Sequence, residues 1–102
     1  DGVIDWNKDA LTLEREIKAY IEWPKSRTRL GSVDVVITKA YCVPSNTPDS
    51  KPGDIKIIPE INLLSVETKN GCLYIEKLKP VGKKEMDSQA FLARYKNRVF
   101  EY

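Results

Sequence analysis

The sequence has 102 residues and contains no histidine. Without an imidazole, the chain lacks a Ser-His-Asp or Cys-His arrangement, a histidine metal ligand and the side chain most often used for proton transfer at neutral pH. Its carboxylates are scattered rather than paired for acid–base catalysis, and its five glycines form no phosphate-binding loop. These absences argue against a catalytic site or a metal site in this chain.

Cysteines and long apolar runs are also scarce. The two cysteines, Cys42 and Cys72, form no Cys-x-x-Cys motif, so we expect two separate, mostly buried, reduced thiols in a cytoplasmic protein. No stretch approaches the roughly 18 consecutive apolar residues of a transmembrane helix. The length fits one domain, and a start at Asp1 without a signal peptide predicts that residues 1–102 are one domain of a longer chain.

The basic residues are concentrated in two segments. The net charge is only +2, but residues 25–51 and residues 76–102 each carry +3, whereas residues 1–24 carry −3. If the fold brings the two basic segments together, they form a positive patch that can attract phosphate groups. If the fold keeps them apart, they are ordinary solvated surface.

Apolar spacing predicts a helix near each end of the chain. The first runs from Asn7 or Asp9 to Tyr20 or Ile21, because apolar side chains from residue 13 onward fall on one helical face. It ends before residues 23–24, Trp-Pro, since the residue preceding a proline is pushed out of the helical region. The second begins after its cap, Asp87, and its apolar face consists of Phe91, Leu92, Tyr95 and Val99.

Between the helices, short apolar and β-branched runs predict strands separated by turns. Residues 3–6 are a further short apolar entry that can form a strand. Asn70-Gly71 is a strong hairpin signal, in which both turn positions are expected to have positive φ. The predicted strands are residues 25–30, 33–43, 55–58, 63–68 and 72–78. The order predicts a mainly β fold, a small β-barrel with a flanking helix at each end.

Two groups of basic residues are candidates for binding. Lys25, Arg27 and Arg29 alternate, so they point to one side of a strand. This pattern fits a phosphate backbone and equally fits an edge strand protected by charge. In the second group, Lys83-Lys84 lie on an exposed connection, and residues 94 and 98 are arginines one helical turn apart.

Several segments resemble the C-terminal domain of methionyl-tRNA formyltransferase, in that family's order from about residue 3 to residue 95. Residues 3–6, Val-Ile-Asp-Trp, and the later Trp23-Pro24 are similar to the family's IDW … WP opening. Residues 52–55 resemble its PGTI strand entry, and residues 66–71 resemble its V-x-T-x-x-G hairpin. Residues 78–86 are close to its LQPxGKKxM signature. The sequence departs from the family's FLxGY segment at Arg94, which replaces glycine, and residues 44–51 carry no motif.

The resemblance implies an open Greek-key β-barrel, similar to an OB-fold, that is not itself catalytic and helps to hold tRNA. The family's N-terminal domain, absent from this chain, moves a formyl group from 10-formyltetrahydrofolate to initiator methionyl-tRNA. The implied partners are that tRNA and that catalytic domain of the same chain, with no membrane and no metal. The predicted RNA-binding residues are Lys83 and Lys84, from the family motif, and Lys25, Arg27, Arg29, Arg94 and Arg98, from the charge pattern.

Two other functions remain open. The same module occurs in formyltransferases that act on small molecules such as nucleotide-linked sugars, and in 10-formyltetrahydrofolate dehydrogenase. There it resembles a structural or interdomain module without RNA binding. The third possibility is a structural domain with no ligand, which basic segments on opposite faces would favour.

Overall fold

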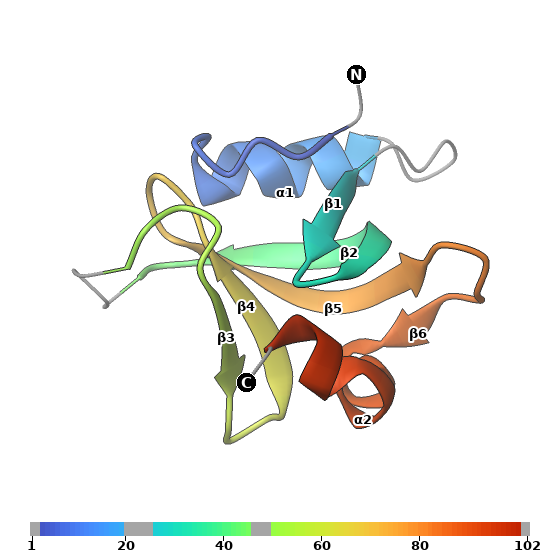
Figure 1. Ribbon diagram of the computed structural model, residues 1–102. Helices are drawn as coiled ribbons and strands as arrows, with labels where there is room; N and C mark the ends of the chain where they lie inside the picture. The colour runs from blue at the N-terminus through green and yellow to red at the C-terminus, as the bar shows by residue number, and fades with distance from the viewer. Residues whose placement is uncertain (1–2, 20–25, 46–49, 101–102) are drawn as a thin grey trace.

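The computed structural model describes residues 3–19, 26–45 and 50–100, where an antiparallel sheet lies between two helices (Figure 1). The predicted helix stop at Trp23-Pro24 and the predicted site residue Lys25 lie outside these ranges. In chain order the elements are α1 (Ala10–Ala19), β1 (Arg27–Leu30), β2 (Val33–Val43), β3 (Ile55–Ile58), β4 (Leu63–Glu67), β5 (Cys72–Pro80), β6 (Met86–Asp87) and α2 (Ser88–Val99).

The sheet has the strand order β1-β2-β5-β4-β3, with β6 paired to β5, and every ladder is antiparallel. Strands β3, β4 and β5 follow one another as hairpins, and β2 lies beside the last of them, which is a Greek-key arrangement. Strands β1 and β3 are the two edges, so the curled sheet is an open half-barrel (Figure 1). The predicted fold class is confirmed.

The sheet curls where the alternation of buried and exposed side chains is interrupted in both β2 and β5. In β2, buried Ile37 and Ala40 are separated by two polar residues, and in β5 the same spacing separates Ile75 and Leu78. The register between the strands shifts at this point, around Lys39. Such bulges increase the local bend. The apolar residues before and after the bend therefore face the same interior.

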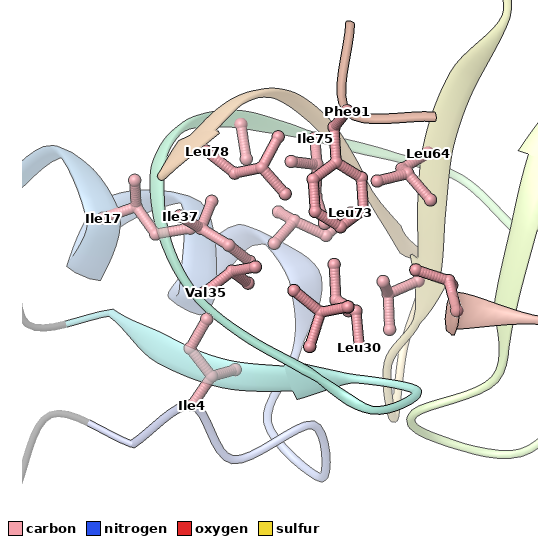
Figure 2. Close-up of a cluster of buried hydrophobic side chains, with 14 of the residues drawn as sticks. Ile4, Ile17, Leu30, Val35, Ile37, Leu64, Leu73, Ile75, Leu78 and Phe91 are labelled. Atoms are coloured by element: carbon pink, nitrogen blue, oxygen red, sulfur yellow. The ribbon is translucent and has the colours of Figure 1, made fainter. Parts of the chain in front are cut away.

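Both helices bury side chains in the interior of the half-barrel. Leu13 and Ile17 of α1 belong to the same hydrophobic cluster as Phe91 of α2, although the helices lie on either side of the curled sheet in Figure 1. Figure 2 shows Phe91 pointing toward Leu73, with Leu64 beside them. The predicted apolar face of α2 is confirmed, as is its cap, since the Asp87 carboxylate accepts the Ala90 amide proton at 2.8 Å.

Two local predictions are wrong, and side-chain hydrogen bonds explain both. Val3 makes only one isolated bridge, to Arg27, because the Asp5 carboxylate accepts the Asn7 amide proton at 3.0 Å and turns the chain out of an extended path. In the β4–β5 turn, Gly71 has φ +83° but Asn70 is not in the left-handed region. There the Thr68 hydroxyl lies 2.9 and 2.7 Å from the carbonyl oxygens of Asn70 and Gly71 and holds a different turn.

The start of α1 agrees with the second of the two predicted positions. The helix begins at Ala10, directly after Asp9, whose carbonyl oxygen accepts the Leu13 amide proton at 3.1 Å. The Ala10 amide donates to the carbonyl oxygen of Asn70 at 3.0 Å, so the β4–β5 turn supplies an acceptor at the start of the helix. This contact fixes the N-terminal end of α1 against the sheet.

The two cysteines are free thiols, with Cys42 half-buried and Cys72 buried, as predicted. They lie on neighbouring strands, where Cys42 pairs with Leu73 and Cys72 pairs with Val43. Because successive side chains alternate between the faces of a sheet, the two thiols point to opposite faces. The register of β2 and β5 therefore keeps the two thiols on different faces of the sheet.

The carboxylate of Glu14 joins α1 to β2. It accepts the backbone amide proton of Cys42 at 2.8 Å and lies 3.4 Å from the ammonium of Lys18, one helical turn further along α1. The backbone hydrogen bond, followed by the Lys18 charge, lowers the pKa of Glu14 below its usual value, against an opposing effect of burial. The folded state is therefore stabilised by the ionised form of Glu14.

Glu14→Gln is expected to lower the free energy of unfolding by about 1 kcal/mol at pH 7, because the amide keeps the shape but loses the charge. A pKa lowered on folding adds stability above the unfolded pKa, and this stability disappears as the pH falls through the folded pKa. The difference between the variant and the parent chain should therefore shrink as the pH falls through the lowered pKa of Glu14 and vanish below it. Urea unfolding at pH 7 and at a series of lower pH values measures this, with Glu16→Gln, at an exposed pair with Lys8, as the control. A difference that is unchanged at low pH would contradict this role.

Candidate functional site

The turn of the β1–β2 hairpin is bonded to the last turn of α2. The backbone amide and hydroxyl of Ser32 donate to the carbonyl oxygen of Arg98 at 3.1 and 3.2 Å, and the Arg98 guanidinium donates to the Ser32 carbonyl at 3.4 Å. Gly31, with φ +62°, makes this approach possible, since a Cβ there would lie 2.4 Å from the Arg98 oxygen. The two basic segments of the sequence therefore meet here.

The turn between β5 and β6 is fixed beside β2 by backbone hydrogen bonds. The Val81 amide donates to the carbonyl oxygen of Asp34 at 3.0 Å, and the Lys83 amide donates to that of Pro80 at 2.9 Å. Gly82 takes a positive φ of +78° within this turn. Lys83 is thus held close to the β1–β2 hairpin by contacts that do not involve its own side chain.

Two adjoining grooves contain basic residues from both segments. One, of about 380 Å³, is lined by residues that include Arg27 and Arg29. The other, of about 230 Å³, is lined by residues that include Lys83 and Arg98. Both grooves are lined by Asp34 and Val81, so they meet along the outer side of β2.

Of the predicted site residues, the structure brings four together and leaves two aside. Arg27, Arg29, Lys83 and Arg98 line the adjoining grooves. Lys84 is exposed next to Lys83, and Arg94 is exposed on α2 one turn before Arg98, but neither lines these grooves. Lys25 lies outside the described residues.

Strand register extends the basic surface with three lysines that were not among the predicted residues. Arg27 pairs with Val36, and Val36 pairs with Lys79, so these residues form a row across β1, β2 and β5. Lys39 pairs with Lys77 at the bend. A hollow of about 690 Å³ there is lined by Lys39, Lys77 and Lys79, and also by Glu76 and Glu85. The sequence carries a signal for two of these lysines. Apolar Leu78 lies between Lys77 and Lys79, and this alternation indicates that both lysines point away from the core when Leu78 is buried. We call the combined surface the basic face: Arg27, Arg29, Lys39, Lys77, Lys79, Lys83 and Arg98.

The ion pairs of Arg29 and Lys39 on the basic face are weak. The Arg29 Nε lies 3.8 Å from the Asp34 carboxylate, and both side chains are 68% exposed. The Lys39 ammonium lies 3.4 Å from Glu76. Exposed pairs of this kind contribute about 0–1 kcal/mol, so an incoming anion can displace them at little cost. Because β1 is an edge strand with outward-facing arginines, its topology fits both phosphate binding and protection of the edge.

The described residues hold no group of three His, Cys, Asp or Glu side chains that could bind a metal ion. In the same part of the chain, neither helix combines the length and the apolar character needed to cross a membrane.

The fold is an open Greek-key half-barrel whose outer surface carries the basic face. Comparison with known proteins identifies the family. Residues 1–96 match the family described as formyl transferase, C-terminal domain. The chain belongs to this family, which confirms the resemblance seen in the sequence.

The relatives found by sequence are longer proteins. A methionyl-tRNA formyltransferase from Symbiobacterium thermophilum is 32% identical over 92 residues, which are 90% of this chain and 28% of that protein. One from Methylococcus capsulatus is 36% identical over 89 residues, which are 87% of this chain and 28% of that protein. The chain thus spans little more than a quarter of the length of these relatives.

Solved structures support the fold independently. A crystal structure of a HypX variant from Aquifex aeolicus matches with a TM-score of 0.71 and 20% sequence identity, covering 96% of this chain and 18% of that one. HypX from the same organism in complex with tetrahydrofolic acid matches with a TM-score of 0.70, over 92% of this chain and 17% of that one. At this identity the likeness shows the shared fold.

Proposed function

We propose that this chain is the non-catalytic C-terminal domain of a methionyl-tRNA formyltransferase. It helps to bind and orient initiator methionyl-tRNA through phosphate contacts, for formyl transfer from 10-formyltetrahydrofolate. The names of the relatives support the parent enzyme. The observation that carries tRNA binding is that the hairpin and α2 meet at Ser32 and Arg98, which places cations from both basic segments on one face.

The chemistry of the basic face suits a polyanion. Arginine and lysine neutralise phosphates and release the counterions that surround a nucleic acid, and such contacts fix orientation without reading sequence. On the basic face the cations come from β1, β2, β5, α2 and the β5–β6 turn, so their spacing is set by the sheet and by backbone hydrogen bonds. This surface orients an RNA, while binding of 10-formyltetrahydrofolate and the chemical step belong to a separate catalytic domain.

A salt titration tests the proposal. The chain is expected to bind initiator tRNA at about 50 mM salt and to lose most of that affinity by about 200 mM, because about four to seven phosphates are neutralised. Fluorescence anisotropy with labelled tRNA gives the slope of log affinity against log salt. Absence of binding at the lower salt, or binding that is indifferent to salt, would contradict tRNA binding.

A second candidate, an interdomain module without RNA binding, is favoured by two exposed valines. Val3 and Val81 are 67% and 71% exposed, and both line the groove that contains Arg27 and Arg29. Apolar side chains at such positions can be covered by another domain. The same titration separates the candidates, because only the first requires salt-dependent binding of tRNA by this chain.

A further inference from the structure

A carboxylate lies in the middle of the basic face. Asp34 lines both of the adjoining grooves, and in each groove it has two cationic neighbours, Arg27 with Arg29 in one and Lys83 with Arg98 in the other. A carboxylate repels phosphate, so a surface that bound only phosphates would be stronger without it. At this position the Asp34 carboxylate would instead complement a ligand group that donates a hydrogen bond.

The structure holds this carboxylate outward and in place. Asp34 lies in β2 between buried Val33 and Val35, so its side chain points away from the core. Its backbone carbonyl accepts the Val81 amide proton at 3.0 Å, and its cross-strand partner is Arg29. Within the described residues, Arg29 is the only charged partner of the carboxylate, at 3.8 Å and with both side chains mostly exposed. That pair leaves acceptor oxygens of Asp34 available to a ligand.

We propose that Asp34 is a specificity-determining residue, which accepts a hydrogen bond from a ribose 2′-hydroxyl while the flanking cations hold the neighbouring phosphates. This inference rests on the proposed function and adds a preference for RNA over DNA. Along a nucleic acid backbone, phosphates are acceptors only, and the 2′-hydroxyl is the donor that distinguishes RNA from DNA. An ionised carboxylate has only acceptors to offer, so it complements that hydroxyl and gains nothing from deoxyribose.

The test compares a short hairpin RNA with a DNA hairpin of the same sequence, at one fixed salt concentration, on the 102-residue chain. The parent chain is expected to bind the RNA about tenfold more tightly, the worth of one hydrogen bond to a charged group. In Asp34→Ala both hairpins should bind more tightly, because a repulsive charge is gone, and the RNA-to-DNA affinity ratio should fall toward one. Glu60→Ala, which removes an exposed carboxylate from the β3–β4 turn, is the control and should keep the parental ratio.

Each outcome is decisive. Equal affinity of the parent chain for RNA and DNA, with normal salt dependence, would overturn the role of Asp34 and leave the proposed function standing. An Asp34→Ala variant that keeps the parental preference for RNA would do the same. If neither hairpin binds the parent chain and initiator tRNA does not bind either, the proposed function and the role of Asp34 fail together. A thermal melt of Asp34→Ala that matches the parent chain shows that a changed ratio does not come from unfolding.

Discussion

Gly31→Ala is expected to lower the free energy of unfolding by about 2–5 kcal/mol. Gly31 has φ +62°, a conformation that costs a residue with a Cβ about 1–2 kcal/mol. The added Cβ would also lie 2.4 Å from the carbonyl oxygen of Arg98 and 2.6 Å from the Cα of Val99. These are backbone atoms, so the hairpin and α2 must move apart, which adds about 1–3 kcal/mol. Urea unfolding measures the loss, and the melting temperature should fall by at least about 10 °C.

Gly82→Ala is the matched control for this substitution. Gly82 also has a positive φ, +78°, but no atom lies within 4 Å of the position where its Cβ would be. The free energy of unfolding of Gly82→Ala should therefore fall only by the cost of a positive φ, about 1–2 kcal/mol. Equal losses in the two variants would show that the close approach of the hairpin to α2 contributes nothing to stability.

The double substitution of Arg27 and Arg29 by alanine is expected to weaken tRNA binding by about 25-fold at low salt. Each arginine near a phosphate contributes about 1 kcal/mol in a solvent-exposed setting, which is roughly a fivefold effect. The slope of log affinity against log salt should become shallower by about one for each cation removed. Both side chains are exposed on β1 and line the same groove, so the fold should be retained. Anisotropy titrations at several salt concentrations measure the two quantities together.

The matched control removes the same charge elsewhere. Lys51 and Lys69 are exposed on loops around β3 and β4 and line no groove of the basic face. Their double substitution by alanine lowers the net charge equally, so it should reduce affinity only through the weak long-range field. If both double variants lost affinity to the same extent, net charge rather than the basic face would account for the binding.

Most elements of the fold were predictable because their signals are local. Apolar spacing identified the helix containing Leu13 and Ile17, and the cap at Asp87 marked the start of α2. The conformation of the β4–β5 turn was less predictable. The Thr68 hydroxyl bonds to carbonyl oxygens in this turn, and a rule based on Asn70-Gly71 alone does not take Thr68 into account. Local signals placed the start of α1 at Asn7 or Asp9, but they could not show that the Ala10 amide donates to the carbonyl oxygen of Asn70.

The candidate site depends on contacts that are distant in sequence. The bonds between Ser32 and Arg98 join residues 66 positions apart, so no local pattern could show that the two basic segments meet. The contribution of Lys79 requires the register of two ladders, which place it in one row with Arg27. By contrast, the outward direction of Arg27 and Arg29 was predictable, because it follows from alternation within a single strand.

The proposed function requires the basic face to be the surface that contacts tRNA. Backbone amide chemical shifts of the isotope-labelled chain, recorded with and without initiator tRNA at low salt, test it most directly. We expect the shifted or broadened amides to concentrate on β1, the β5–β6 turn and the last turn of α2, around Arg29, Lys83 and Arg98. Changes confined to β3 and the β3–β4 turn, with these segments unaffected, would contradict it.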